Sequence, residues 1–387
     1  MRGVGVVGAS GRAAAHSLAR AGFSAWAVDQ FADRDLKRLA ACAICTHDYP
    51  IGIPTLAARF PPGPVLYTGG LENHPQVVAK LAEQRELWGN PPEVLARVRD
   101  PFTLFPALAE AGFTTPRLVP QGQRCPSEGP WLRKPLRSGG GTGIRFAQPG
   151  EAASHDHVFQ EFIDGRSMSA LFLSAPTETE PTWETKLIGV TEQLIGEQWL
   201  HSKPFAYCGN IGPTELLHSQ EVQLEIHAQL LNERSRMRGA WGLDFVRQHE
   251  VDYPVEVNPR YTSAIEVLEL AWNCSFVGAH GACFTEPDAL AKYKRWRRYD
   301  SPLGKAIYYA PHTFRFPSSG PWDADLTGAF DPWRLPQFAD IPEVGSVIEA
   351  GWPVLTFFET GSTPQVVRER LQSRAVELDR LFRDSRP

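Results

Sequence analysis

Polar side chains recur along two short apolar segments in the second half of the chain. Asp244 lies within residues 241–247, and Glu256, Asn258 and Arg260 alternate along the next apolar segment. Because side chains of a β-strand alternate between two faces, these last three share one face. Polar groups gathered on one face are costly in a core unless something binds them. Carboxylate and amide oxygens suit a Mg²⁺ that bridges nucleotide phosphates. The pattern therefore predicts a metal and phosphate site, with a solvated antiparallel face as the alternative.

A lysine stands just before a glycine-rich segment. Lys134 closes the apolar stretch 131–135, and the loop 138–143 that follows contains four glycines. One cation with several backbone amides suits a polyphosphate. Because the lysine precedes the glycines, neither the P-loop spacing nor the dinucleotide spacing fits. The segment predicts a phosphate site of another type, with a plain surface loop as the alternative.

The first residues carry a second glycine pattern. Gly5, Gly8 and Gly11 lie at an expected strand-to-helix turn, and Asp29 ends the next expected strand. Such a turn can bring backbone amides to a phosphate, and an acid about 20 residues on can hold a ribose. A tight turn between a strand and a helix also needs small residues for purely structural reasons. We favour the structural interpretation, and nicotinamide dinucleotide binding stays open.

The sequence predicts two kinds of structure around these residues, a parallel α/β unit and a β-rich region. Apolar strands at 2–8, 24–28 and 65–67, with a helix from Arg12 to about Gly22, predict a parallel α/β unit. From residue 158 onward strands separated by polar turns dominate, and 241–247 and 254–258 are expected to form a hairpin. Further expected elements are the helices 220–238, 264–283 and 364–382 and the strands 305–311 and 352–359.

Local composition indicates where the domains of the chain begin and end. Gly89-Asn90-Pro91-Pro92 and Asp100-Pro101 mark the end of a first domain. We expect an N-terminal α/β domain (1–95), a small subdomain with the glycine loop (96–160), a larger subdomain with the metal site (161–300) and a strand and helix extension packed on that core (301–387).

The overall balance of residues excludes several classes of protein. The chain of 387 residues is 42% hydrophobic with a net charge of −5, which excludes a disordered chain and gives no electrostatic reason to bind nucleic acid. No apolar run reaches the ~18 residues of a membrane span, and the first residues lack the apolar core of a signal peptide. The six cysteines are too scattered for a disulfide scaffold. We expect a cytoplasmic protein.

Taken in order, the lysine with its glycine loop, the strand at 160–163 and the residues from Asp244 to Arg260 resemble the ATP-grasp family. The resemblance spans roughly residues 1–283, and the first unit matches the Rossmann-like domain that usually precedes the ATP-grasp core. It implies an α/β fold, α+β in the ATP-binding part, with ATP and Mg²⁺ (or Mn²⁺) as cofactors. Members of the family phosphorylate a carboxylate, and a nucleophile then displaces phosphate.

The resemblance implies a role for each matched residue. Lys134 would contact the α- and β-phosphates, and Arg260 would stabilise the reacting anion, as in relatives of biotin carboxylase. The metal ligands would be Asp244, Glu256 and Asn258. The loop over the β- and γ-phosphates would comprise Ser138, Gly139, Gly140, Gly141 and Gly143, and the adenine would be read by the strand Gln160, Glu161, Phe162 and Ile163.

Two positions depart from the family pattern. Where members have an Asp-Lys pair at the start of the second domain, this chain has Arg99, which leaves open whether the arginine replaces the lysine. Where an acid often holds the ribose after the strand that reads adenine, this chain has Gly165-Arg166-Ser167. Lys186 is a further lysine that could reach the γ-phosphate, with an exposed strand lysine as the equal alternative.

Other segments are similar to a bacterial and archaeal group of predicted ATP-dependent carboligases related to biotin carboxylase. These segments are 67–72, 205–213 and 351–354. The group often accompanies one-carbon metabolism based on cofactors of the tetrahydromethanopterin or methanofuran type. Tyr207, Gly209 and Asn210 would then line the cleft as substrate contacts, although a structural edge strand explains them equally well.

The expected function is a carbon–nitrogen ligase that acts on a small-molecule carboxylate and an amine, without nucleic acid or membrane, and a homodimer is compatible with it. Two alternatives stay open. One is an NAD(P)-dependent oxidoreductase built on the N-terminal turn and Asp29. The other is a nucleotide-binding protein of weak activity, because of the missing lysine and ribose acid.

Overall fold

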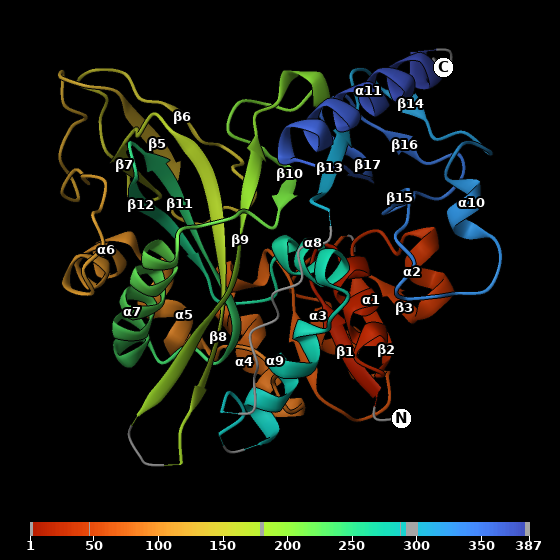
Figure 1. The fold of residues 1–387 in the computed structure, drawn as a ribbon, viewed down its shortest axis with the longest axis horizontal. Helices are drawn as coiled ribbons and strands as arrows, with labels where there is room; N and C mark the ends of the chain where they lie inside the picture. Colours follow the sequence, from red (N-terminus) through yellow and green to blue (C-terminus); the bar gives the residue numbers. More distant parts are fainter. Residues whose placement is uncertain (1–2, 46, 179–181, 287, 292–300, 384–387) are drawn as a thin grey trace.

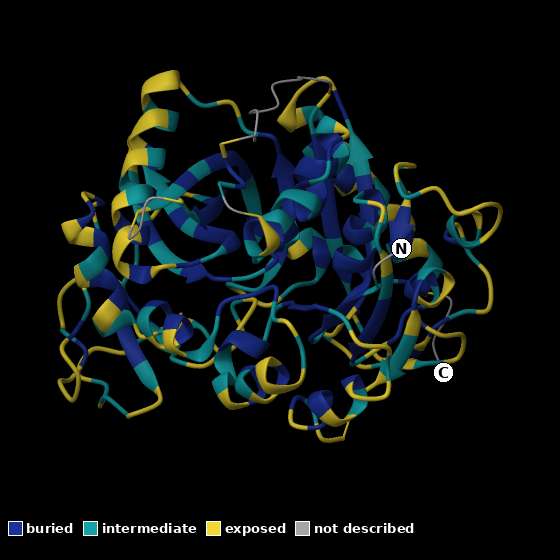
Figure 2. Cartoon of the chain, turned by 90° about the horizontal axis from the view of Figure 1, so that it is seen from below, coloured by how far each residue is buried: buried dark blue, intermediate teal, exposed yellow. Residues whose placement is uncertain are grey.

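The computed structural model describes residues 3–45, 47–178, 182–286, 288–291 and 301–383. Two larger sheets and two small ones organise this part of the chain, which is shown as a ribbon in Figure 1. Buried residues follow the strands, and exposed residues gather on outer loops and outward helix faces (Figure 2). Among the described residues, no helix combines the length and the apolar character needed to cross a membrane.

The N-terminal domain is a four-stranded parallel sheet in the order β3-β2-β1-β4. Its strands are β1 (Gly3–Val7), β2 (Ser24–Asp29), β3 (Ala41–Ile44) and β4 (Val65–Tyr67). Its helices are α1 (Arg12–Arg20), α2 (Arg34–Leu39), α3 (Ile53–Ala57) and α4 (Pro75–Gln84), and a 3-10 turn, η1, covers Leu71–Asn73. The expected parallel α/β unit is confirmed, and it places the β4–η1 loop at the carboxyl edge of the sheet.

A small antiparallel sheet follows, in the order β6-β5-β7. Helices α5 (Pro92–Arg99) and α6 (Pro101–Glu110) lead into β5 (Trp131–Pro135), β6 (Arg145–Phe146) and β7 (His157–Glu161). Asp100 separates the two helices because its carboxylate accepts a hydrogen bond from the amide of Phe102, which caps α6. The sequence division at 95/96 falls inside α5.

The largest sheet has eight antiparallel strands in the order β12-β11-β8-β9-β10-β13-β17-β15. These strands are β8 (Arg166–Pro176), β9 (Trp183–Ile195), β10 (Tyr207–Gly212), β11 (Gly239–Gln248), β12 (Val251–Asn258), β13 (Leu303–Tyr309), β15 (Phe338–Ala339) and β17 (Pro353–Thr360). The expected hairpin is β11–β12. The last three strands continue the sheet itself, because β13 pairs with β10.

Helices cover this sheet and join it to its neighbours. They are α7 (His218–Ser235), α8 (Ser263–Trp272), α9 (Phe276–Thr285), α10 (Asp323–Leu326) and α11 (Pro364–Arg383), with η2 at Gln198–Leu200 and a small pair of strands, β14 (Phe314–Arg315) and β16 (Val347–Ile348). The single helix expected at 264–283 is two helices, because Asn273 adopts a left-handed conformation with φ of 50°.

Buried ion pairs join the N-terminal domain to the large sheet at α8. Arg12 of α1, whose side chain is 0% exposed, pairs with Glu266 of α8 and, at 2.9 Å, with Asp340. Lys305 of β13 donates to the other oxygen of Glu266 at 2.6 Å. Burial alone would raise the pKa of the Glu266 carboxyl, but Arg12 and Lys305 lower it strongly. Glu266 is therefore held as an anion between the N-terminal domain and the large sheet.

Arg12→Ala should destabilise the protein by about 3 kcal/mol, because it leaves the buried Glu266 with Lys305 alone in place of two cations and removes the guanidinium that pairs with Asp340. The free energy of unfolding by denaturant measures this. Lys37→Ala is the control, since Lys37 joins the same two regions through an exposed pair with Glu343 at 2.7 Å and should cost about 1 kcal/mol or less. Equal losses in the two variants would contradict the assignment.

His280 predicts an acid-sensitive stability. Its Nδ1 accepts from the amide of Ala240 at 2.8 Å and its Nε2 faces the carbonyl of Trp88 at 3.1 Å, and burial lowers the pKa of the ring to about 4. Between pH 6.5 and 4 the unfolded chain binds the proton that the folded protein excludes, so stability falls by roughly 3 kcal/mol as the pH drops. Denaturant unfolding at pH 7 and pH 4.5 should show a larger loss for the wild type than for His280→Gln; an equal loss would count against it.

Candidate functional site

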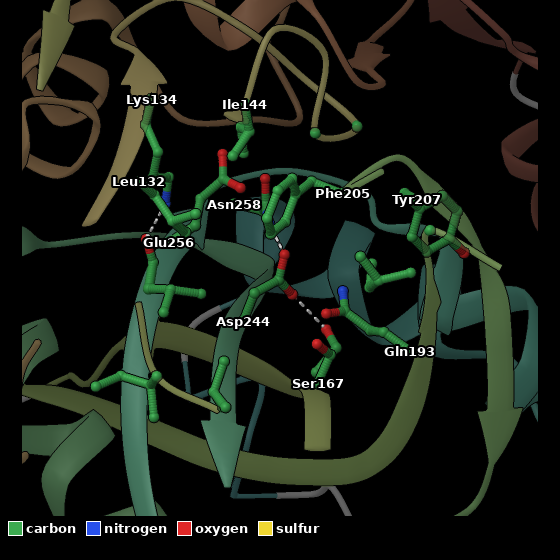
Figure 3. A pocket seen from close by; sticks show the side chains of 18 of the residues that line it. Leu132, Lys134, Ile144, Ser167, Gln193, Phe205, Tyr207, Asp244, Glu256 and Asn258 are labelled. Atoms are coloured by element: carbon green, nitrogen blue, oxygen red, sulfur yellow. Dashed lines mark hydrogen bonds between the residues drawn. The ribbon is translucent and has the colours of Figure 1, made fainter. Parts of the chain in front are cut away.

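A cavity of about 700 Å³ lies between the small sheet and the large sheet. Its walls come from β5, β7, β9, β10, β11 and β12 and from the glycine loop. Figure 3 shows Lys134 and Glu256 on one side, Gln193 and Tyr207 on the other, and Asp244 between them. Segments far apart in the sequence thus meet in one hollow.

The acidic group is built by the β11–β12 hairpin. Asp244 lies directly opposite Glu256 in the register, and Asn258 faces the same side two residues later. Asn258 Nδ2 and Ser169 Oγ donate to the carboxylate of Asp244 at 2.9 and 2.8 Å. Burial and the neighbouring Glu256 raise the pKa of Asp244 to about 6. Two carboxylates side by side in a cavity favour an added cation.

Lys134 reaches this hairpin from the small sheet. Its Nζ donates to Gln160 Oε1 at 3.0 Å and to the carbonyl of Val255 at 3.2 Å. Burial lowers the pKa of this ammonium, and the nearby Glu256 carboxylate acts in the opposite direction. The lysine is thus tied to both sheets by neutral acceptors that an anion could replace.

The glycine loop leans over the cavity and touches β10. The amide of Tyr207 donates to the carbonyl of Gly140 at 3.0 Å. Gly141 has a φ of +77°, and a Cβ there would lie 1.8 Å from the carbonyl oxygen of Phe205. Only glycine allows this approach.

One end of the cavity is apolar. Phe146 contacts Phe162 and Phe205 edge to face, with ring centroids 5.1 and 5.4 Å apart. The side chains that complete this end are Leu132, Ile144, Ile163 and Ile195. A flat apolar ring system would fit here, next to the backbone of β7.

Another part of the cavity lining is polar. Tyr207 donates to Asn210, whose Nδ2 donates to Thr191 at 2.9 Å. Arg260 also lines the cavity, together with Thr262, a buried residue whose Oγ1 has no partner in the described part of the chain. This part offers one guanidinium among neutral hydrogen-bonding groups.

Two arginines contact the hairpin residues Glu256 and Asn258. Arg260 Nη2 donates to Asn258 Oδ1 at 3.1 Å and pairs with the buried Glu72 of η1 at 2.7 Å. Arg99 pairs with Glu256 at 2.5 Å. Arg99 and Lys134 both border a second cavity of about 70 Å³ under the glycine loop. Arg99 therefore borders the same small cavity as Lys134.

Most residues singled out in the sequence meet in this region, and a few do not. Ser138 and Gly139 line the smaller cavity. Gly143 borders neither cavity. Gly209 is needed for strand packing, because a Cβ there would lie 1.9 Å from the carbonyl oxygen of Lys305. Lys186 pairs with Glu184 at 2.7 Å and lies outside both linings. The sequence analysis gave no role to Phe146, Ser169 and Gln193, and it named Glu72 and Phe205 only within the segments 67–72 and 205–213; the alternation Ser167-Met168-Ser169 along β8 could have indicated Ser169.

The N-terminal glycine turn uses its polar groups internally. The carboxylate of Asp29 accepts from the amides of Gly11, Phe31 and Ala32 at 3.2, 3.1 and 2.6 Å. The amide of Ala9 donates to Gly69. Neither the acid nor these amides remain for a dinucleotide, which favours the structural interpretation of this turn.

Comparison with known proteins supports the assignment of the fold. Residues 98–264 match the model of a family described as the ATP-grasp domain. The sequence matches no protein of curated function.

Solved structures of similar fold cover nearly the whole chain. The biotin carboxylase domain of 2-oxoglutarate carboxylase from Hydrogenobacter thermophilus, a dimer in complex with MgADP, ADP and bicarbonate, has a TM-score of 0.71 at 14% identity over 96% of this chain and 89% of that one. An L-amino acid ligase from Bacillus licheniformis has a TM-score of 0.67 at 14% identity over 98% and 97%. The ADP complex of N5-carboxyaminoimidazole ribonucleotide synthetase has a TM-score of 0.64 at 14% identity over 96% of each chain. The expected ATP-grasp fold, with its parallel N-terminal sheet, is confirmed.

Gly141→Ala should release the glycine loop from β10, because its Cβ would collide with the carbonyl of Phe205. Amide hydrogen exchange at Tyr207, measured without ligand, should become about tenfold faster or more. Gly140→Ala is the matched control: it shares the positive φ, at 60°, but its Cβ would meet nothing within 4 Å. The same acceleration in both variants would show strain rather than contact.

Proposed function

We propose that this chain, whose residues 98–264 match the ATP-grasp domain family, is an ATP- and Mg²⁺-dependent ligase that phosphorylates a small carboxylate and transfers the acyl group to an amine. The observation that carries the proposal is the meeting of Lys134, the glycine loop, the Asp244–Glu256 pair and Arg260 around one cavity of about 700 Å³. Relatives of the same fold are described in complex with ADP, one of them with magnesium.

The donor set fits a hard divalent cation. Asp244, Glu256 and Asn258 supply only oxygen ligands, which Mg²⁺ or Mn²⁺ prefers. Among the described residues no three His, Cys, Asp or Glu side chains gather closely enough to hold a metal. Mg²⁺ commonly takes one or two carboxylates and completes its shell with phosphate and water, so two carboxylates and an amide suit a cation shared with ATP. Bound there, the cation would neutralise charge on the transferred phosphoryl group.

The chain's own residues divide the remaining work. The apolar end with Phe146 and Phe162 takes adenine against β7, while Lys134 and the amides of the glycine loop hold the phosphates. Closure of the loop onto β10 excludes water from the acyl phosphate. Arg260 in the polar part of the lining orients the substrate carboxylate and stabilises the negative charge of the tetrahedral intermediate.

The resemblance of segments 67–72 and 205–213 supports a narrower version of the proposal. In it the substrates belong to one-carbon cofactor metabolism of the tetrahydromethanopterin or methanofuran type, and Tyr207 and Asn210 contact the carboxylate substrate. A homodimer is the assembly proposed, in line with the dimer described for the biotin carboxylase domain.

Thermal unfolding with ATP–Mg²⁺, ADP–Mg²⁺, ATP with EDTA, and NADH tests the nucleotide site. A ligand at a hundredfold excess over its Kd stabilises the folded state by about 2.7 kcal/mol, so ATP–Mg²⁺ should raise the melting temperature of the wild type and not that of Lys134→Ala. Lys186→Ala, a lysine of β9 in the large sheet that lies outside the cavity lining, should respond like the wild type.

Glu256→Gln tests the contribution of the metal ion separately from that of the nucleotide. This variant should keep the wild-type fold but lose the difference between ATP–Mg²⁺ and ATP with EDTA. Stabilisation by NADH alone, or by none of the four, would refute the proposal. After a positive result, phosphate release in the presence of pairs of carboxylic acids and amines would identify the substrates.

A further inference from the structure

Two consecutive residues of the N-terminal domain reach the site across the domain boundary. Both belong to η1 (Leu71–Asn73). Glu72 Oε1 accepts from Arg260 Nη2 at 2.7 Å, and Asn73 Oδ1 accepts from Arg99 Nη2 at 3.1 Å. The same Asn73 donates from Nδ2 to the carbonyl of Ser138, at the start of the glycine loop, at 3.1 Å.

Each arginine carries its contact onward to the acidic group. Arg260 donates to Asn258 at 3.1 Å, and Arg99 donates to Glu256 at 2.5 Å. Two short chains of hydrogen bonds, called relays below, thus lead from η1 to β12. One ends at Asn258 and the other at Glu256, and both of these residues are proposed metal ligands. Arg99 adds a contact to the carbonyl of Ser138 at 3.3 Å, so the second relay also includes the glycine loop.

The local sequence of η1 is suited to this approach. Gly70 has a φ of +101°, which lets the chain turn sharply after β4, and a Cβ at Gly69 would lie 3.4 Å from the guanidinium carbon of Arg260. The positive φ of Gly70 therefore allows the turn that leads into η1, and a Cβ at Gly69 would be in ordinary van der Waals contact with the Arg260 guanidinium. Both glycines belong to the segment 67–72 that sequence analysis singled out and that the proposed chemistry leaves unexplained.

Burial makes the first relay a strong constraint. The side chain of Glu72 is 0% exposed and that of Arg260 is 14% exposed. A buried carboxylate needs its cation, and the planar guanidinium is fixed by further contacts to Asn258 and to the carbonyl of Tyr261 at 3.1 Å. Arg260 cannot turn toward another partner while Glu72 holds it.

Both arginines keep an unused donor. The Nε atoms of Arg99 and Arg260 are buried and lack a partner among the described residues. A buried donor without an acceptor is costly, and an incoming phosphate or carboxylate oxygen would relieve this cost. The contacts to Glu72 and Asn73 thus fix two guanidinium groups whose residues border the two cavities.

We propose that η1 is a positioning element of the site, in which Glu72 orients Arg260 and Asn73 orients Arg99 and the glycine loop. The N-terminal domain thereby sets the geometry of the anion and phosphate groups without touching the reacting atoms itself. The Asn73 arm rests on the proposed function, because its ligand is ATP–Mg²⁺; the Glu72 arm does not.

The Asn73 arm is tested by the affinity for ATP–Mg²⁺, measured by calorimetry. Asn73→Ala should weaken binding about tenfold, the loss expected for one hydrogen bond to a charged group. If Asn73 acts mainly through Arg99, the double variant Asn73→Ala/Arg99→Ala should bind more tightly than the product of the two single losses predicts, because only the contact of Asn73 with the Ser138 carbonyl is left to lose. Gln76→Ala, an exposed neighbour in α4, should bind like the wild type. Losses that multiply in the double variant would overturn the Asn73 assignment.

The Glu72 arm is tested without any ligand, by hydrogen exchange across residues 259–264. Glu72→Ala should speed exchange there about tenfold, whereas Glu72→Gln, which keeps an acceptor for Nη2, should speed it less. In an Arg260→Ala background, Glu72→Ala should add nothing. Unchanged exchange, or an equal effect in both backgrounds, would overturn the assignment. If the wild type fails to bind ATP–Mg²⁺, the proposed function fails while this arm still decides the positioning role.

Discussion

The buried ion pair between Arg12 and Glu266 is the constraint on which the arrangement of the molecule depends. Glu266 lies in the first turn of α8, six residues after Arg260, and α8 lies between the N-terminal domain and the large sheet (Figure 1). Its two oxygens are shared between Arg12 and Lys305, and Asp340 completes the group. A cation or an anion of this group left alone in the interior would cost several kcal/mol, so only a narrow range of docking angles satisfies all four charges.

This ion pair affects the site because α8 follows β12 after only a few residues of chain. The segment that leaves β12 carries Asn258 and Arg260 and enters α8 directly, so whatever fixes α8 also fixes the end of β12. Arg20 of α1 adds a second tie, because it pairs with Glu269 of α8 at 2.8 Å. The net stability gained from such pairs is modest, since the charges would be hydrated if the domains separated. Their main effect is to make wrong dockings unfavourable, which keeps η1 opposite the two arginines.

Local patterns made part of the site predictable. Glu256, Asn258 and Arg260 alternate along a strand, and Asp244 faces Glu256 because a short hairpin fixes its register. Lys134 and its glycines are neighbours in sequence and needed no tertiary information. The contacts of Arg99 were not predictable in this way: its partners Asn73, Ser138 and Glu256 are 26, 39 and 157 residues away. Gly209 was assigned to a substrate, although its φ of +145° and its approach to β13 show a packing role. The pairing of β10 with β13 is likewise long-range, and only the fold shows that the last strands extend the main sheet.

The N-terminal turn shows why a motif needs its surroundings. In sequence, Gly8, Gly11 and Asp29 match the start of a dinucleotide site as well as that of a structural turn. In the structure Asp29 accepts three backbone amides, and Arg12, the first residue of the helix, turns its side chain into the interface with α8. A dinucleotide would need the acid and the turn amides that these contacts already use. At this edge of the parallel sheet, the polar side chain of α1 therefore docks the domain on α8, and those of η1 position Arg260 and Arg99. This division is consistent with a domain that supports a nucleotide site on its neighbour.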